Sequence, residues 1–397
     1  MVVKIYRLIF VLLAVIYANE LNARLYFIHV PKTGGTTLRL LLEQQLATNE
    51  IYPFRHQKHA NAAIEQSLVS GHFSYSFCKN RDPEFERAFK ITILRDPVER
   101  YLSFLRAKKK ADPSLTSLES VFELRRAPHG KYSMGLIDNA LCRQLAKNPH
   151  LTGEALLTSA KEALLEFDEI IFYDHYSEEV SLLFERLGID LPQEEIPWLN
   201  ATTPEPVSQK LLEEVKSLNE LDRELYTYAK AHYVKRENKY ELRTQSYKEL
   251  LSPKNEIHYT FDQPLNGHGW TYRDLFDLSR IERPIFRWVT DSPAVIYFFL
   301  EEGLDYDVYF TARPIVSEIS PQMSVNGVEI PLSQLSQAPF SLYHGVISKD
   351  LIQKLPTELM FFGTKACEYR KVNPLPFNRN HPPLSFALNE IKIQSRK

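Results

Sequence analysis

The residues of this chain that are best suited to chemistry begin in a loop with two glycines, Val30-Pro31-Lys32-Thr33-Gly34-Gly35-Thr36-Thr37. Glycines let main-chain amides approach a phosphate closely, and a helix that starts after them points its positive end at the anion. The threonine hydroxyls add donors, and Lys32 adds a full charge. Lys32 precedes the glycines and the first Walker A glycine is missing, which disfavours an ATPase P-loop. An ordinary glycine turn is the alternative.

A second motif, Leu94-Arg95-Asp96-Pro97-Val98-Glu99-Arg100-Tyr101-Leu102-Ser103, contains an arginine followed by a helix. Arg95 would lie at a strand end and Ser103 two turns into the helix, so both are candidates for one further phosphate. The planar fork of arginine binds two phosphate oxygens at once. The alternative is that Arg95 and Asp96 only cap the helix.

A glycine-histidine pair lies between these motifs, in Ser70-Gly71-His72-Phe73-Ser74-Tyr75. A lone histidine is more often structural than catalytic. Here the preceding glycine and the position between two phosphate motifs favour a functional role. A neutral imidazole can take the proton of a hydroxyl near neutral pH, so we predict His72 as a general base.

Strand–loop–helix units must position these residues. Apolar Leu25–Val30 predicts a buried strand, and Thr36–Leu46 has helical periodicity. Lys90–Leu94 and Val98–Lys110 repeat this order around Arg95. Two such units predict an α/β fold, a parallel sheet flanked by helices.

The rest of the first domain continues this pattern. We predict helices over Gly153–Phe167, Glu178–Leu187 and Gln209–Tyr233, with a short strand at Glu169–Tyr173. The predicted domain covers residues 24–245.

From residue 255 the pattern changes to short strands between Pro, Gly and Asn turns, which predicts an all-β sandwich over residues 255–397. The expected strands include Phe286–Val289, Val295–Leu300, Val308–Thr311, Ser324–Ile330 around an Asn-Gly turn, and Leu359–Gly363. Trp270 and Trp288 are candidates for stacking on sugars, with core packing as the alternative.

Composition limits the function classes. The 397 residues carry 48 Lys and Arg against 50 Asp and Glu, a net charge of −2, which argues against nucleic acid as a partner. Any anion must be held by a local patch. The basic run 106–110 is a candidate for contact with an acidic glycan, or simply a solvated helix end. His56 and His59 lack nearby carboxylate or cysteine partners, so no metal is expected.

The N-terminus and the cysteines bear on location. Residues 1–23 contain Lys4 and Arg7 before an apolar run that ends at Ala18. This is a signal or anchor pattern, or an extra packed element; membrane association would use residues 4–18. Cys78, Cys142 and Cys367 form no disulfide framework, although one Cys78–Cys142 bridge is left open. We expect a cytoplasmic protein, with a membrane anchor as the alternative.

The ordered motifs HVPKTGGTT, GHFSY and ILRDPVERYLSF resemble the sulfotransferase family that includes heparan sulfate and uronyl 2-O-sulfotransferases and their bacterial relatives. Asp138–Leu145 looks like the family's DN-x-x-x-R-x-L segment, and Asn219–Lys230 resembles its closing helix. The resemblance covers about residues 25–240.

The resemblance implies a P-loop-like α/β fold and 3′-phosphoadenosine 5′-phosphosulfate (PAPS) as the sulfuryl donor, and no metal is required. It places the 5′-phosphosulfate loop at Lys32–Thr37, the 3′-phosphate site at Arg95 and Ser103, and the base at His72. Arg143 falls where the family has an arginine near the site. The expected reaction is transfer of a sulfuryl group to a hydroxyl of a carbohydrate. The alternatives are a P-loop nucleotide kinase or NTPase, and an inactive glycan-binding protein.

Overall fold

The structure is a computed structural model that describes most of the chain. It covers residues 24–52, 64, 66–112, 114–126, 138–189, 205–235, 245–271, 286–337, 340–352, 356–366 and 383–396. The chain forms two compact units, Met1–Arg39 with Asn49–Leu242 and Leu40–Thr48 with Arg243–Lys397. The N-terminal apolar segment, His56, His59 and Cys367 lie outside the described residues.

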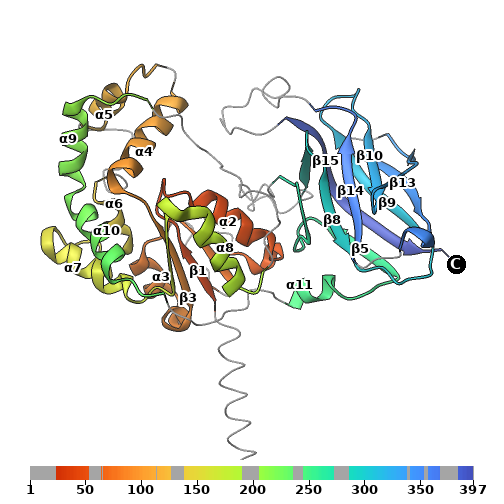
Figure 1. The fold of residues 1–397 in the computed structure, drawn as a ribbon, viewed down its shortest axis with the longest axis horizontal. Helices are drawn as coiled ribbons and strands as arrows, with labels where there is room; N and C mark the ends of the chain where they lie inside the picture. Colours follow the sequence, from red (N-terminus) through yellow and green to blue (C-terminus); the bar gives the residue numbers. More distant parts are fainter. Residues whose placement is uncertain are drawn as a thin grey trace, which may run out of the picture. The chain divides into compact units, whose positions relative to one another are not determined.

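The first unit contains a sheet of four parallel strands in the order β2-β1-β3-β4 (Figure 1). The strands are β1 Leu25–Ile28, β2 Leu68–Gly71, β3 Phe89–Leu94 and β4 Glu169–Phe172. Nearly every strand residue is buried, as expected for a parallel sheet covered on both faces. The predicted α/β class is confirmed.

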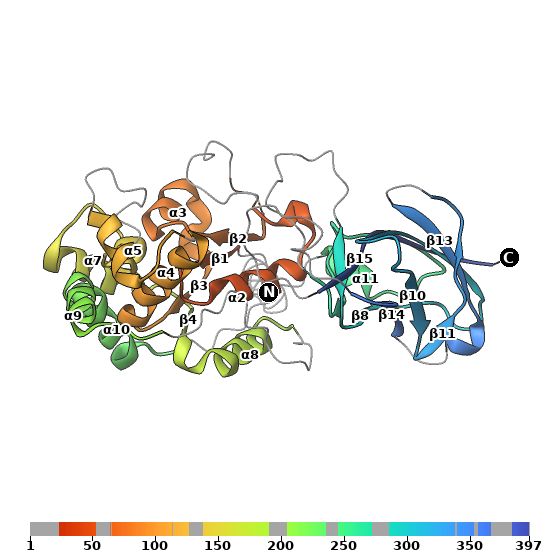
Figure 2. The same cartoon turned by 90° about the horizontal axis from the view of Figure 1, so that it is seen from above.

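Helices cover both faces of this sheet. The described helices before residue 242 are α2 Gly35–Gln44, α3 Tyr75–Arg81, α4 Pro97–Ala111, α5 Leu118–Arg126, α6 Ala140–Leu145, α7 Gly153–Leu164, α8 Tyr176–Arg186, α9 Gln209–Leu218 and α10 Glu220–His232. Of these, α5 and α9 pack against α4. Figure 2 shows α3 on one side of the sheet and α2 and α8 on the other. On the α3 side, strand residues such as Tyr26 and Ile170 share an apolar core with α6, α7 and α10.

The predicted helix over Gln209–Tyr233 is wrong in one respect, because the chain forms two helices that meet at Asn219. This residue ends α9 and begins α10 with φ −120°. Its amide donates to the Val215 oxygen at 2.8 Å and accepts from buried Arg100 at 3.5 Å. A fully buried asparagine whose side chain bonds the backbone of the preceding turn interrupts the helix, although the apolar periodicity continues past it.

The second unit contains two antiparallel sheets. One has the order β11-β10-β14-β8-β6, and the other the order β12-β13-β9-β15-β5, with β7 paired to β15. A short helix, α11 Gln245–Leu250, precedes the strands β5 Glu256–Thr260, β6 Gly267–His268, β7 Arg287–Thr290, β8 Ala294–Phe298, β9 Tyr306–Pro314, β10 Pro321–Val325, β11 Val328–Ile330, β12 Ser333–Gln334, β13 Ser341–Ile347, β14 Thr357–Gly363 and β15 Leu384–Ser395. The β-rich character predicted for this region is confirmed.

One apolar cluster joins the two sheets of this unit. Phe361 of β14 meets Phe310 of β9 with ring centroids 5.3 Å apart. Trp270 is 7% exposed and donates its indole N–H to the Val295 oxygen at 2.7 Å, so it is a core residue and does not serve as a sugar platform. Trp288 is half-buried. The predicted Asn-Gly turn joins β10 to β11, with Asn326 and its glycine neighbour at positive φ.

Two further findings concern the cysteines and the membrane. Cys78 and Cys142 are both buried and free, so the bridge left open between them does not form. No helix within the described residues is long and apolar enough to cross a bilayer.

The alternation along β14 gives a stability test. Phe361 is fully buried between the sheets, whereas its neighbour Phe362 points to the other face and is half-buried. We expect Phe361→Ala to lower the free energy of unfolding of this unit by about 3–5 kcal/mol, because it opens a cavity. Phe362→Ala is the matched control and should cost far less. Urea unfolding of both variants checks this; equal losses would contradict the register.

Candidate functional site

The predicted site residues gather at one edge of the parallel sheet. Strands β1, β2, β3 and β4 run in the same direction, so their carboxyl ends share this edge. The glycine-containing loop follows β1, His72 follows β2, Arg95 follows β3 and Tyr173 follows β4. Crevices at the carboxyl ends of parallel strands are the usual ligand sites of α/β folds.

The glycine-containing loop has the shape of an anion cradle. Lys32 has φ 71° and Gly34 has φ 88°, both in the left-handed region. For a lysine this conformation costs about 1–2 kcal/mol, a strain that clusters at functional sites. The Thr33 hydroxyl donates to the Val30 oxygen at 2.8 Å and so fixes the loop. Helix α2 then starts at Gly35 with its positive end toward the loop.

Two tyrosines that the sequence reasoning missed hold this loop in place. The hydroxyl of Tyr176 donates to the Gly34 oxygen at 3.2 Å. A Cβ atom on Gly34 would lie 2.9 Å from Cε2 of Tyr173, so no larger residue fits there without movement. Burial raises the pKa of Tyr176, which therefore stays a neutral donor. The only sequence signal for either tyrosine was the position of Tyr173 as the last residue of the predicted strand Glu169–Tyr173.

Cations surround the loop. The pKa of the Lys32 ammonium is lowered, first by its burial and then by the positive charges of Arg95, Lys108 and Lys110. Lys108 and Lys110 belong to the basic run near the end of α4. A chain with a net charge of −2 thus concentrates positive charge at this loop. A bound polyanion would neutralise the mutual repulsion.

Arg95 connects the second motif to this loop. Its Nη1 donates to the Lys32 oxygen at 3.3 Å, and its guanidinium lies 4.3 Å from the centre of the Tyr173 ring. Its Nε is buried with no hydrogen-bond partner among the described residues. Asp96 caps α4 by accepting from Val98 and Glu99. Capping is therefore the role of the aspartate, and the arginine contacts the glycine-containing loop and Tyr173 instead.

Ser103, Thr36 and Thr37 are less directly placed. Ser103 is 4% exposed on α4, and no described hydrogen bond links it to Arg95 or to the loop. Thr37 is 4% exposed, and its hydroxyl contacts Tyr176. Thr36 is half-buried in the first turn of α2. The predicted nucleotide roles of these three side chains remain predictions.

His72 is exposed at the same edge and is oriented by a backbone contact. Its Nδ1 lies 2.8 Å from the main-chain oxygen of His29. Because a carbonyl oxygen only accepts, Nδ1 carries the hydrogen, and the lone pair of the neutral ring lies on Nε2. Nε2 is therefore the atom that can take a proton from a substrate.

His29, which directly precedes the glycine-containing loop, is a second histidine at this edge. Its ring lies 4.4 Å from that of His72, and it is 4% exposed. A Cβ atom on Gly35 would lie 2.3 Å from the His29 ring, so the glycine is required by this close approach. The pKa of His29 is well below its usual value, first because of burial and then because of His72, Arg39 and Lys32. It is a neutral residue of the site's interior.

The DN-x-x-x-R-x-L segment acts mainly through residues other than its arginine. Asn139 has φ 47°, and its side-chain oxygen accepts from the Asp222 N–H at 3.2 Å. Asp222 in turn accepts from the N–H groups of Leu141 and Cys142 at the start of α6. The described hydrogen bonds include none from the Arg143 side chain. Its neighbour Gln144 bonds directly to the His29 and Phe73 oxygens.

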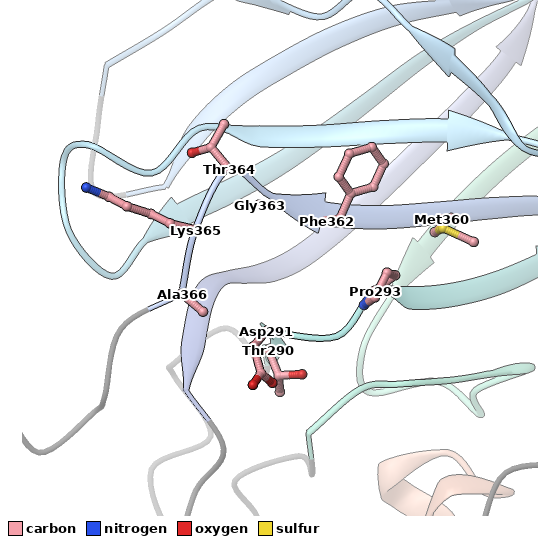
Figure 3. A pocket seen from close by; sticks show the side chains of 9 residues that line it. All are labelled: Thr290, Asp291, Pro293, Met360, Phe362, Gly363, Thr364, Lys365 and Ala366. Carbon is pink, nitrogen blue, oxygen red and sulfur yellow. The ribbon is translucent and has the colours of Figure 1, made fainter.

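A separate cavity of about 480 Å³ lies in the second unit (Figure 3). It is lined by residues at the ends of β7 and β14, including Thr290, Asp291, Phe362, Thr364 and Lys365. None of the predicted site residues lines it. Among the described residues, no group of three His, Cys, Asp or Glu side chains is placed to hold a metal.

Comparisons with known proteins bear on the first unit. Residues 19–150 match a model described as the sulfotransferase family. Among solved structures, the chain is similar to mouse sulfotransferase SULT7A1 complexed with PAP, with 13% identity and a TM-score of 0.28, over 56% of this chain and 72% of that chain. A search of curated proteins found no match.

The buried state of His29 predicts a dependence of stability on pH. Its folded pKa is depressed, so below pH ~6.5 the unfolded chain binds a proton at this residue that the folded protein does not. Stability should fall by up to about 1.4 kcal/mol per pH unit as pH drops toward the folded pKa. His29→Phe should remove this slope, whereas exposed His150→Gln should keep it. Urea unfolding between pH 5 and 7.5 measures both variants, and a wild-type slope in His29→Phe would contradict the assignment.

Proposed function

We propose that the protein transfers a sulfuryl group from PAPS to a hydroxyl group of a carbohydrate, starting from the match of residues 19–150 to the sulfotransferase family model. The observation that carries the proposal is the shared sheet edge. It holds a cation-rich loop after β1, an oriented histidine after β2 and, after β3, an arginine whose buried Nε has no hydrogen-bond partner within the described part of the chain.

The residues at this edge fit a nucleotide with phosphates at two positions. Lys32, the loop amides and the start of α2 suit the 5′-phosphosulfate. Arg95 suits the 3′-phosphate, because its Nε is a buried donor with no hydrogen-bond partner among the described residues. The guanidinium is held against Tyr173, so little conformational freedom is lost when an anion binds. When bound, PAPS supplies the sulfuryl group and a nucleotide phosphate as leaving group.

In the proposed reaction, His72 acts on the acceptor and Lys32 on the leaving side. Nε2 of His72 takes the proton of the acceptor hydroxyl as its oxygen attacks sulfur, and Nδ1–H stays bound to the His29 oxygen. Lys32 and the loop amides stabilise the negative charge that grows on the bridging oxygen. These donors are fixed before the reaction, which makes their electrostatic contribution large.

A carbohydrate acceptor is the finer part of the proposal. It is supported by the resemblance of residues 25–240 to glycan 2-O-sulfotransferases and by the presence of a β-rich second unit. We assign residues 24–245 to the transferase domain and residues 255–397 to an accessory domain. A nucleotide kinase is disfavoured because Lys32 precedes the glycines, and an inactive glycan-binding protein is disfavoured because Lys32, His72 and Arg95 are all present.

Arg95 provides a test of the nucleotide site. We expect Arg95→Ala to weaken binding of 3′,5′-ADP by about 10- to 100-fold, because a charge-assisted hydrogen bond contributes roughly 1.5–3 kcal/mol. Binding of 5′-AMP, which lacks the 3′-phosphate, should hardly change. Calorimetry with both nucleotides measures this. Equal losses would show that Arg95 only supports the loop.

His72 provides a test of the reaction itself. We expect His72→Ala to reduce the rate of sulfation of a glycan panel from radiolabelled PAPS by about 10²–10⁴-fold, the usual contribution of a placed base. Binding of 3′,5′-ADP should persist, because the ring faces the acceptor. The wild-type rate should also fall as pH drops through the histidine pKa, since the protonated ring accepts no proton.

An unchanged rate for His72→Ala would end the base assignment. Loss of thermal stability together with nucleotide binding would show instead that His72 only fixes the loop after β2.

A further inference from the structure

We infer that Gln144 is a positioning residue that sets the tautomer and orientation of His72, acting through the main-chain oxygen of His29. The inference rests on the proposed role of His72 as the base. It assigns a function to a side chain next to Arg143, at a position where the family segment has no fixed residue type.

The contacts of Gln144 are specific. Its side chain is 8% exposed, and its Nε2 lies 2.9 Å from the His29 oxygen and 2.8 Å from the Phe73 oxygen. Both hydrogens of the amide are therefore donated to main-chain oxygens. One of these oxygens precedes the glycine-containing loop, and the other directly follows His72. A single amide thus joins the two segments that carry the proposed chemistry.

The His29 oxygen is shared between Gln144 and His72. It accepts from Gln144 Nε2 at 2.9 Å and pairs with His72 Nδ1 at 2.8 Å, which uses both of its lone pairs. The main chain of His29 is also fixed, since its N–H donates to the Gly71 oxygen at 3.0 Å. An acceptor held from two sides keeps the His72 ring in the Nδ1–H tautomer, so that Nε2 is the atom presented to the acceptor.

The residue type and its helix suit this task. Asparagine is shorter by one methylene and cannot span to both oxygens, and glutamate offers no pair of donors. Helix α6 is itself held, because Asp222 accepts from the N–H groups of Leu141 and Cys142 at its start. A rigid helix transmits a fixed position to the amide, which is what support of a catalytic group requires.

The primary test separates binding from catalysis. We expect Gln144→Met, which keeps the volume and removes both donors, to lower kcat about tenfold, the rate equivalent of about one hydrogen bond. Affinity for 3′,5′-ADP should stay within about twofold. Ser159→Ala is the matched control. Ser159 is also 8% exposed and accepts from Asn148 N–H at 3.0 Å, but it contacts neither segment. If Met is not tolerated, Gln144→Glu keeps the length and loses the pair of donors.

A double-mutant cycle then identifies the route of the effect. If Gln144 acts through His72, adding Gln144→Met to His72→Ala should cause no further loss of kcat. The same tenfold loss in both backgrounds, or an unchanged kcat in the single variant, would overturn the inference.

A measurement that needs no turnover tests the positioning role of Gln144 independently of the proposed function. Nitrogen-15 NMR of histidine-labelled protein, with the His72 signals assigned from His72→Ala, reports the tautomer directly. We expect the Nδ1–H form in the wild type and a mixture of tautomers in Gln144→Met. An unchanged tautomer overturns the positioning role of Gln144. An active His72→Ala enzyme would instead overturn the base role while leaving the tautomer result standing.

Discussion

The parallel pairing of β1 with β2 and β3 is the constraint on which the site depends. Ile28 lies opposite Gly71 on one side and Thr92 on the other, so β1 and β2 end in step and β3 continues two residues further, to Leu94. The pairing continues past Ile28, because the His29 N–H donates to the Gly71 oxygen. On the other side of β1, the Thr92 hydroxyl donates to the Ile28 oxygen at 2.9 Å. A shift of one residue in this register would turn every strand side chain to the opposite face.

Charge is arranged around that edge in a way that the overall composition conceals. Arg95 comes from another loop, and Lys108 and Lys110 come from the end of α4, yet the charges of all three lower the pKa of Lys32. In the first turn of α4, Arg100 is fully buried near Asp222, whose carboxylate caps the start of α6. The helix that follows Arg95 therefore serves both the surface of the site and the packing behind it.

Much of the fold follows from local sequence, and the exceptions have physical causes. Helix α4 was predicted within one residue at each end, because Asp96 and Pro97 are a strong start signal. Strand β15, the longest, was not predicted. Its buried residues Phe386 and Leu388 change phase before Ile391, at a bulge that breaks the alternation a sequence pattern needs.

The residues of the candidate site also differ in whether local sequence could predict them. Lys32 and Arg95 were predictable because each follows a predicted strand within a short motif, and His72 because it follows a glycine between these two motifs. Their supports were not, because the contacts join residues far apart in sequence, such as Gln144 and His29 at a separation of 115 residues. No periodicity or spacing rule reports such a pair.

The hydroxyl of Tyr176 that holds the Gly34 oxygen has a consequence for synthesis of the chain. The two residues are 142 positions apart, so the loop leaves the ribosome long before its support exists. Strand β4 and the first turn of α8 must be made and docked before the loop is held in its final shape. At roughly 5–20 residues per second, this gap lasts about 7–30 seconds. The glycine-containing loop is thus made well before the contact that holds it in its final shape can form.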